Sequence, residues 1–493
     1  MRVVLAEKPS VARDLAAFLG ARTRRAGYFE GEGWCVTWAF GHLVALKEPE
    51  GYDPAYKRWS LEHLPIVPER FELEPTGDDR AKQQFATIVQ LFRAADEIVC
   101  ATDAGREGEL IFRYILELSG CQPKPARRLW LSSLTETAIR QAFDELRPTS
   151  EYDRLYAAAR CRSEADWIVG MNATRNYTVR FRSGGVLWSV GRVQTPVLAL
   201  IVERDEEIRH FRPEPWFELR TKYRDVVFKA RGDRFRERDE AEAKAASIRG
   251  SEFVVTDVAR REERVQPPQL FDLTALQREM NQRYGMSAQD TLKIAQSLYE
   301  QKLVTYPRTD SRYLTRDMEP DVRATLATLR DRYERAARPL DLDDLPITKR
   351  VFDDTKVDDH HAIVPTGRSP SGLDGSGARV YDAIALRLVA AFCPVCVKQV
   401  TTVDGKAVAV KFRARGVRVV EPGWTVVDPP KRSKKQDDDL DEQVMPEFER
   451  GERGAHDPEV KEGSTKPPRS FTEASLLGAM ETAGKLVDDE RLR

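Results

Sequence analysis

Two strand-turn-helix units near the beginning of the chain constrain its fold more than any other feature of the sequence. The apolar run 3–6 is followed by a polar turn and by apolar residues at helical spacing over 11–19. The apolar run 97–101 leads in the same way into apolar residues that line one helix face over 110–118. Alternating strands and helices predict an α/β domain with a mostly parallel sheet, which we assign to residues 1–150.

Both predicted strands are followed by carboxylates. Glu7 and Lys8 come directly after the first strand, and Asp103 and Glu107 come after the second. In an open parallel sheet, residues just past the carboxyl ends of the strands converge on one crevice, where oxygen ligands suit a hard cation such as Mg²⁺. Acidic residues in such turns also cap helices, but two clusters at paired strand ends favour a metal site made by Glu7, Asp103 and Glu107.

The segment 154–192 combines positive charge with aromatic rings. Seven arginines face two acidic residues there, although the whole chain of 493 residues has 79 Lys+Arg, 80 Asp+Glu and a formal net charge of −1. This balance excludes a uniformly basic protein, so a nucleic-acid surface has to be a local patch. Guanidinium groups between rings suit a groove for single-stranded nucleic acid, whereas in the other interpretation the rings belong to an ordinary helical core. The local charge ratio favours the groove.

Downstream of this segment the periodicity changes from helical to alternating and back. Three segments with alternating β-branched residues predict antiparallel strands: 216–223, 253–258 and 400–420. Between them, helical spacing predicts one helix that ends at Gly285 and another that begins after Ser287. This order predicts a β domain of residues 213–268 with 398–464, interrupted by a helical domain of residues 269–397.

Several classes of protein do not fit this sequence. The N-terminus lacks a cationic and apolar leader, and no apolar stretch approaches the ~18 residues of a membrane span, so we expect neither secretion nor membrane insertion. Six scattered cysteines do not suggest a disulfide framework, which favours a reducing cytoplasm. Cys393 and Cys396 have the spacing of a zinc knuckle, but without a second ligand pair we interpret them as buried thiols. The charged segment 428–464 predicts a solvated loop or linker.

The segment TYPRTDSR carries the strongest local signal for covalent chemistry. Tyr306 precedes a proline and lies two residues before Arg308. A tyrosine hydroxyl is a poor nucleophile alone and needs a nearby cation to stabilise negative charge, and a guanidinium also matches a phosphate. On the pattern alone, a Tyr-Pro turn with a solvated arginine is the favoured interpretation. A further segment pairs two acids with His360 and His361, which could bind a metal, assist proton transfer or lie on a polar loop.

Taken together and in this order, these segments resemble the type IA DNA topoisomerases, and most closely their bacterial topoisomerase III branch. The matching motifs, in chain order, are AEKPSVA (6–12), VTWAFGHL (36–43), ATDAGREGELIFR (101–113), RSEADWIVGMNATRNYT (162–178), SVGRVQTPVL (189–198), TYPRTDSRYL (305–314), DDHHAIVPT (358–366) and VVEPGW (419–424). The resemblance implies a toroid of four domains. The N-terminal domain is then Toprim-like, the helical insert bears a nucleophilic tyrosine and the β segments form an arch.

The resemblance also implies a role for each matching residue of the catalytic segments. Tyr306 attacks a phosphodiester of a single strand and forms a 5′-phosphotyrosine link. Arg308 stabilises the phosphoryl transition state, and Glu7 protonates the departing 3′ oxygen. Lys8 contacts the scissile phosphate, and His360 assists from the hinged domain. Because the tyrosyl bond keeps the phosphodiester energy, no ATP is needed, and the sequence has no GxxxxGK[ST] loop.

For cofactor and substrate, the resemblance implies Mg²⁺ held by Asp103 and Glu107 together with Glu7, and DNA bound through single-stranded regions. The DNA contacts implied by the matching motifs are Arg162, Arg175, Tyr177, Ser189, Arg192, Gln194 and Thr195. Many relatives carry an acid where this chain has Gly105, so we expect a higher Mg²⁺ requirement than in a Gly105→Asp variant. We also expect a cytoplasmic monomer that works with a helicase.

The C-terminal segment is expected to return to the arginine-rich domain, which we assign to residues 151–212 with 465–493. Residues 466–480 resemble the family's strand-to-helix route into that domain. The expected buried face of the helix consists of Leu476, Leu477 and Met480. Relatives continue into a GxGTPATR-like segment that lines the groove, and this chain has no counterpart, so we expect weaker DNA binding.

Two alternative functions stay open at this level. A Toprim nuclease or primase-like enzyme would share the strand-end carboxylates but would have no use for Tyr306. A non-enzymatic single-strand binding protein would need only the arginine-rich groove. A covalent protein-DNA adduct distinguishes a topoisomerase from both, because a hydrolase leaves cut DNA without an adduct and a binding protein leaves neither.

Overall fold

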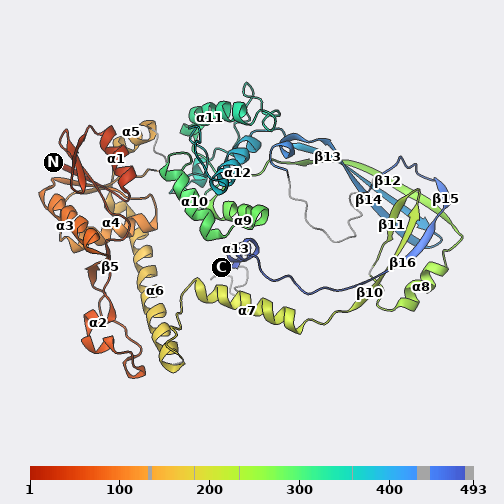
Figure 1. The fold of residues 1–493 in the computed structure, drawn as a ribbon, viewed down its shortest axis with the longest axis horizontal. Coiled ribbons are helices and arrows are strands. Elements are labelled where there is room, and N and C mark those ends of the chain that lie inside the picture. Colours follow the sequence, from red (N-terminus) through yellow and green to blue (C-terminus); the bar gives the residue numbers. More distant parts are fainter. Residues whose placement is uncertain are drawn as a thin grey trace.

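The computed structural model describes residues 1–131, 136–181, 184–232, 234–357, 359–429, 443 and 445–483. Four parts of the chain follow one another around a ring (Figure 1). The N-terminal α/β domain forms one end, and helices α6 (Asp153–Arg180) and α7 (Gln194–His210) lead away from it. A strand-rich domain forms the far end, and a helical domain returns to the N-terminal domain. The predicted order of domains around a toroid is therefore observed.

The N-terminal domain is built on a seven-stranded sheet with the order β2-β3-β4-β1-β7-β8-β9. Its strands are β1 (Arg2–Ala6), β2 (Thr23–Arg25), β3 (Tyr28–Gly31), β4 (Trp34–Trp38), β7 (Glu97–Ala101), β8 (Ala126–Arg128) and β9 (Arg147–Pro148). The central pairs are parallel, and the outer pairs are antiparallel. The prediction of a mostly parallel sheet is confirmed for its centre.

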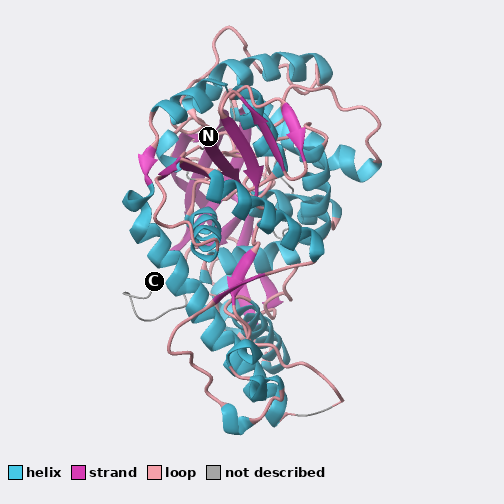
Figure 2. Cartoon of the chain, turned by 90° about the vertical axis from the view of Figure 1, so that its left-hand side faces the viewer, coloured by secondary structure: helices cyan, strands magenta, loops and turns pink. Residues whose placement is uncertain are grey.

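Helices cover both faces of this sheet, as Figure 2 shows. They are α1 (Pro9–Phe18), α3 (Asp79–Ala94), α4 (Arg106–Leu118) and α5 (Glu136–Asp144). Alternate residues of a strand point to opposite faces, so Val3 and Leu5 pack with α3 and α4 while Val4 and Ala6 pack with α1 and α5. Because β1 and β7 are parallel neighbours, the turns that lead into α1 and α4 lie at the same edge of the sheet.

An arm from this domain lies along α6. It contains β5 (Val44–Leu46), α2 (Pro49–Tyr52) and β6 (Leu73–Pro75). The side chain of Asn172 on α6 fixes the arm, because its Oδ1 accepts from the backbone N–H of Ile66 at 2.7 Å and its Nδ2 donates to the carbonyl of the same residue at 2.8 Å. The second half of α6 is thus joined to the arm of the N-terminal domain, while α7 extends toward the strand-rich domain (Figure 1).

The strand-rich domain is a second seven-stranded sheet with the order β15-β12-β13-β14-β11-β10-β16. Its elements are β10 (Pro215–Tyr223), β11 (Val226–Ala230), α8 (Arg238–Ala246), β12 (Glu252–Val265), β13 (Cys396–Ala407), β14 (Val410–Glu421), β15 (Arg453–Ala455) and β16 (Asp457–Ser464). All its strand pairs are antiparallel, and Phe228, Phe253 and Phe412 form the centre of its core. The predicted β domain, split by a helical insert, is observed.

The helical domain between β12 and β13 has its own apolar core. Its helices are α9 (Leu273–Tyr284), α10 (Ala288–Glu300), α11 (Glu319–Arg332) and α12 (Gly375–Ala391). The predicted helix boundaries are confirmed. Gly285 ends α9 in the left-handed conformation with φ 66°, and the Ser287 hydroxyl caps α10 by accepting from the backbone N–H of Asp290. Cys393 and Cys396 are buried free thiols, as predicted, and burial raises the pKa of Cys393 to about 12.

The C-terminal third departs from the sequence prediction in two places. The segment predicted as a solvated linker contains β15, which pairs with β12, and β16, whose full length pairs with residues 215–222 of β10; residues 430–442 and 444 of that segment lie outside the described residues. Asp428, at its start, is buried and paired with Arg283 and Arg387. The linker prediction was wrong for these parts, since a charged edge strand has the composition of a loop.

The last described helix, α13 (Glu473–Glu481), packs against α9 and not beside residues 151–212. The side chain of Asn281 accepts from the backbone N–H of Ala474, and Arg278 pairs with Glu481. The segment before the helix meets the arginine-rich region, where Arg204 donates to the carbonyl of Arg469 and lies over the ring of Phe471. The expected buried face is also wrong, because Ala474 is the buried residue and Leu476, Leu477 and Met480 are half-buried. Within the described residues, no helix has both the length and the apolar character that a membrane span needs.

Candidate active site between the N-terminal and helical domains

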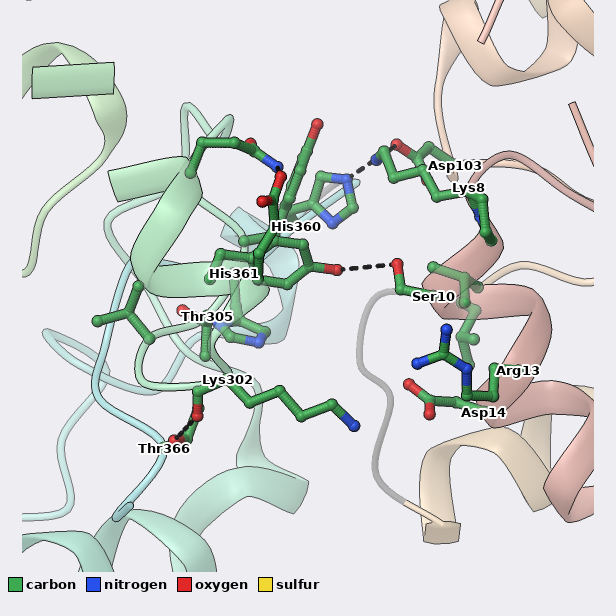
Figure 3. Close-up of a pocket in the computed structure, with 18 of the residues that line it drawn as sticks. Lys8, Ser10, Arg13, Asp14, Asp103, Lys302, Thr305, His360, His361 and Thr366 are labelled. Atoms are coloured by element: carbon green, nitrogen blue, oxygen red, sulfur yellow. Dashed lines mark hydrogen bonds and ion pairs between the residues drawn. The ribbon is translucent and has the colours of Figure 1, made fainter. Parts of the chain in front are cut away.

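A cavity of about 680 Å³ lies where the carboxyl ends of β1 and β7 face the segment after α10. Lys8, Ser10 and Asp103 line one side, and His360 lines the other (Figure 3). The two domains meet directly at its edge, because Ser10 Oγ lies 3.4 Å from the hydroxyl of Tyr299. Residues from three segments far apart in the sequence therefore share one hollow.

Tyr306 lies half-buried in the wall of this cavity. The backbone N–H of Thr305 donates to the carbonyl of Val364 at 2.9 Å, which holds the tyrosine loop against the segment that carries the histidines. The Lys8 ammonium lies 3.8 Å from the centroid of the Tyr306 ring, and the ring of His360 lies 4.6 Å from it. Burial raises the pKa of Tyr306, and the charge of Lys8 opposes that rise. The tyrosine thus has the neighbouring cation that a phenol nucleophile needs.

Lys8, Asp103 and His360 form one polar contact across the domain boundary. Lys8 Nζ donates to Asp103 Oδ2 at 2.5 Å, and His360 Nε2 lies 3.1 Å from the same oxygen. Burial acts to raise the pKa of Asp103, but the hydrogen bond with His360 and the charge of Lys8 outweigh it, so the pKa is lowered. Burial acts to lower the pKa of Lys8, but the charges of Asp103 and Glu7 raise it above its usual value. Asp103 is therefore ionised and Lys8 charged.

Glu7 lies beside Asp103 and has the opposite protonation behaviour. Its Oε2 accepts from the backbone N–H of Asp103 at 3.1 Å. Burial, followed by repulsion from the Asp103 carboxylate, raises the pKa of Glu7 to about 7. A carboxyl group with a pKa close to neutral pH carries a proton that it can give to a departing oxygen. Glu7 therefore acts as the protonated acid of this pair, and Asp103 as the anion.

Arg308, the remaining predicted catalytic residue, and His361, the second histidine, lie in different surroundings. Arg308 is exposed, and its charge also opposes the rise in the pKa of Tyr306. His361 is held by its Nδ1, 2.8 Å from the carbonyl of Ala362, and burial lowers its pKa to about 4. His360 is therefore the member of the pair that reaches the N-terminal domain, and His361 stays neutral within its own domain.

The three carboxylates expected to hold a divalent cation are brought together only in part. Glu7 and Asp103 are adjacent, whereas Glu107 Oε1 lies 2.5 Å from His42 Nε2. That contact lowers the pKa of Glu107 and raises the pKa of His42. Among the residues that the structure describes, no three His, Cys, Asp or Glu side chains are grouped closely enough to hold a metal ion. The oxygens of Glu7 and Asp103 suit a hard cation, but Lys8 already pairs with Asp103.

Sequence analysis missed two residues that shape this site. His42 lies in the quoted motif VTWAFGHL, but its contact with Glu107 depends on the fold. Arg128 on β8 is 1% exposed, and its Nη2 donates to the carbonyl of Asp103 at 2.5 Å. Its Nη1 also lies 3.7 Å from Oε2 of the buried Glu109. This buried guanidinium supports the turn that presents Asp103, and no motif pointed to it.

Two of the predicted DNA contacts lie at a second cavity, of about 450 Å³, between the N-terminal domain and α6. Arg162 and Arg192 line it together with His42 and Glu107. Arg162 is exposed, and Arg192 Nε donates to Asp166 Oδ1 at 2.8 Å. This hollow lies close to the candidate active site, because Glu107 is in the first turn of α4, just after the segment that carries Asp103.

The aromatic residues of the arginine-rich segment divide into core and surface groups. Tyr177 and Phe181 stack with ring centroids 5.8 Å apart, and Trp188 lies 6.2 Å from Phe181. These three rings are 46%, 54% and 45% exposed, respectively. Tyr156 and Trp167 instead pack against the core of the N-terminal domain. The predicted polar contacts near the start of α7 are all exposed: Ser189, Gln194 and Thr195.

Arg175 requires a correction. Its side chain was expected to contact DNA, but it is 5% exposed and its Nη1 donates to the carbonyl of Tyr56 at 2.6 Å. The guanidinium also lies 5.1 Å from the ring of Trp59 and 3.5 Å from Glu50 Oε2. It ties α6 to the arm of the N-terminal domain and does not face solvent. A positive charge ratio along a segment does not show which of its arginines are buried.

Comparisons with known proteins place these observations in context. A family model described as DNA topoisomerase matches residues 150–484, and a Toprim domain model matches residues 2–134. The chain is similar to DNA topoisomerase 3 of Bacillus subtilis, with 40% identity over 99% of this chain and 68% of that protein. It is equally similar to DNA topoisomerase 3 of Shouchella clausii, with 40% identity over 100% of this chain and 68% of that protein.

A solved structure has the same fold. The full-length topoisomerase I from Thermotoga maritima matches with a TM-score of 0.67 and 21% identity, over 98% of this chain and 75% of that one. At this level of identity the likeness concerns the fold alone.

Proposed function

The chain belongs to the family of type IA DNA topoisomerases, and we propose that Tyr306 is the residue with which it cleaves DNA. The observation that carries this proposal is the position of the Tyr306 ring against Lys8 and His360, at the carboxyl ends of β1 and β7. A phosphodiester bound in the adjoining cavity would meet Tyr306 as the nucleophile, Lys8 and Arg308 as cations, and Glu7 as the proton donor. A Toprim nuclease or a non-enzymatic binding protein has no use for the tyrosine.

In the proposed cleavage step, a bond forms between Tyr306 Oη and phosphorus while the bond from phosphorus to the 3′ oxygen breaks. Glu7 gives its proton to that oxygen, and the phenolic proton passes to water in the cavity. Lys8 and Arg308 stabilise the charge on the phosphoryl group. The product is a 5′-phosphotyrosine that stores the bond energy, so the reverse path reseals the strand without ATP.

Toprim domains bind divalent metal ions, and we assign Mg²⁺ as the cation here. The adjacent carboxyl groups of Glu7 and Asp103 would hold it, and Glu107 would join them only after leaving His42; the ion would supply positive charge near the phosphates. DNA is the substrate, and the exposed rings of Tyr177, Phe181 and Trp188 favour single-stranded regions, because unpaired bases stack on exposed rings. We also propose that the protein acts as a monomer in the bacterial cytoplasm and that a helicase supplies these regions.

Strand passage needs an opening in the ring, and the domain boundary at Tyr306 is the proposed gate. The cleaved 5′ end would stay on the helical domain through Tyr306, while the free 3′ end stays with the N-terminal domain. The gate contacts described above are largely polar: Ser10 with Tyr299, His360 with Asp103, and the Lys8 ammonium over the Tyr306 ring. Polar contacts of this kind separate at lower cost than an apolar interface of equal area.

Glu7→Gln is expected to slow cleavage of a single-stranded oligonucleotide about 100-fold or more, because an amide cannot donate the proton that the leaving oxygen needs. The loss should shrink when the scissile 3′ oxygen is replaced by sulfur, since a thiolate departs without protonation. Single-turnover adduct formation on the two oligonucleotides measures both effects. Asp14→Asn, at the edge of the same cavity, is the matched control and should cleave both at the rate of the unmodified protein.

An equal loss on both oligonucleotides would remove Glu7 from the role of general acid. It would leave the carboxyl group as a structural or metal-binding residue. Cleavage by Glu7→Gln at the normal rate would move the proton donor to another residue altogether.

Arg162→Ala is expected to flatten the dependence of single-strand affinity on salt by about one unit of slope, because each lost phosphate contact releases one counterion fewer. Arg175→Ala should leave the slope unchanged, since its guanidinium is bound to the arm. Arg25→Ala, at an exposed arginine on β2, is the control away from the groove. Fluorescence anisotropy over a salt series measures all three. A normal slope for Arg162→Ala would mean that this arginine does not touch phosphate.

A further inference from the structure

The backbone conformation of Gly105 does not require glycine, but the space beside it does. It precedes α4 with φ −158° and ψ −176°, an extended conformation that any residue adopts. A Cβ added there would lie 2.2 Å from Oδ1 and 2.3 Å from Oδ2 of Asp359, far inside van der Waals contact. The carboxylate of Asp359 therefore occupies the space that a side chain at position 105 would need.

Asp359 reaches this recess from the opposite side of the gate. It belongs to the helical domain and directly precedes His360, whose Nε2 lies 3.1 Å from Asp103 Oδ2. Asp359 and His360 of the helical domain thus meet Gly105 and Asp103, which lie in one turn of the N-terminal domain. The contacts of Asp359 with Gly105 and of His360 with Asp103 are formed or lost together when the domains move.

The recess also favours a negative charge. Gly105 is the residue before the first turn of α4 and provides no side-chain cap. The first backbone N–H groups of a helix have no partner within the helix, and the helix dipole is positive at that end. A carboxylate at this position is stabilised even though it comes from another domain. The N-terminus of α4 thus faces the carboxylate of Asp359, which reaches it only when the ring is closed.

We propose that Asp359 is the latch of the gate, a positioning residue whose carboxylate fits the recess at Gly105 only when the helical and N-terminal domains are closed. Seated there, it sets His360 on Asp103 and Tyr306 beside Lys8. This inference rests on the proposed function, because a latch matters for an enzyme whose ring opens. It also replaces the expectation that Gly105→Asp improves metal binding, since that change forces two carboxylates into one space.

The test is a double-mutant cycle on gate closure, measured without DNA. Dyes on Arg22→Cys and Arg338→Cys, both exposed and in different domains, report the distance between the domains by single-molecule energy transfer. Cys161, the one exposed cysteine among the described residues, is replaced by serine so that only the introduced thiols react. The closed-to-open ratio is then compared for Gly105→Ala, Asp359→Gly and the double variant.

Gly105→Ala alone is expected to lower the closed-to-open ratio at least about tenfold, because its Cβ collides with Asp359. Asp359→Gly should lower the ratio about threefold to tenfold by removing the charge at the helix end. In the Asp359→Gly background, adding Gly105→Ala should cost nothing further, since the space is empty. Asp343→Gly, at an exposed acid in a loop of the same domain, should leave the ratio unchanged.

Equal effects of Gly105→Ala in the two backgrounds would overturn the latch, because independent sites are additive. Adduct formation by the protein with its native residues at 105 and 359 keeps this outcome separate from the proposed function. Adducts at Tyr306 without coupling between positions 105 and 359 would leave the function and reject the latch. Coupling without adducts would keep the latch and reject the nucleophile.

Discussion

Tyr306→Phe is expected to reduce covalent adduct formation by about ten-thousandfold or more, while folding and single-strand affinity stay unchanged. The substitution removes one oxygen atom and keeps the ring that lies against Lys8, His360 and Tyr299. Without the hydroxyl there is no atom to accept the 5′ phosphate. Denaturing gels with labelled single-stranded DNA measure the adduct, and anisotropy measures binding.

Tyr313 provides the matched control for this result. It lies seven residues further along the chain, and its hydroxyl accepts a hydrogen bond from Gln269 Nε2 at 2.8 Å. Tyr313→Phe should form the adduct at a normal rate. If Tyr306→Phe still formed adducts and Tyr313→Phe did not, the nucleophile would be Tyr313 and the geometry around Lys8 would have another purpose.

Arg128→Ala is expected to lower the free energy of unfolding by about 3–5 kcal/mol, because it leaves the buried Glu109 without one of its two cations. Glu109 is fully buried, and its other partner is Arg113, whose Nε lies 2.8 Å from Oε1. Chemical denaturation measures the loss of unfolding free energy, and hydrogen exchange in β7 and α4 shows whether the loss arises there. Arg127→Ala, an exposed neighbour paired with Glu97, should cost about 0–1 kcal/mol.

A compensated variant separates stability from positioning. Replacing both charges, as Arg128→Met with Glu109→Met, should restore much of the stability, because an apolar pair avoids the cost of burying charge. Cleavage should be slower than in the unmodified protein, for this variant as for Arg128→Ala, since the carbonyl of Asp103 has lost its guanidinium donor. Full recovery of cleavage together with stability would show that Arg128 serves the fold alone.

Local patterns in the sequence were sufficient to predict the main elements. The apolar runs 3–6 and 97–101 became the central parallel strands, and Gly285 and Ser287 ended and began the expected helices. Each of these signals is contained within about ten residues, which is why the sequence alone reveals it. The ordered motifs then identified the family, and the roles of the site residues stay predictions.

What sequence analysis missed depends on contacts between distant segments. Arg175 carries the same charge as Arg162, and only the packing of the arm on α6 shows that it is buried. Gly105 was interpreted as a missing ligand, because the carboxylate that fills its space comes from Asp359, more than 250 positions away. Charged edge strand β16 was mistaken for a loop, since its partner β10 lies far away in the sequence.

The central claim is that the chain cleaves DNA through Tyr306, and the chemical identity of the adduct tests it most directly. Protein trapped on a single-stranded oligonucleotide is digested with protease and nuclease, and the linked peptide is sequenced by mass spectrometry. The account predicts one peptide, with Tyr306 joined to the 5′ phosphate of a nucleotide, and a free 3′ hydroxyl on the released fragment. A link through another residue, a link through a 3′ phosphate, or cut DNA without any linked peptide would contradict it.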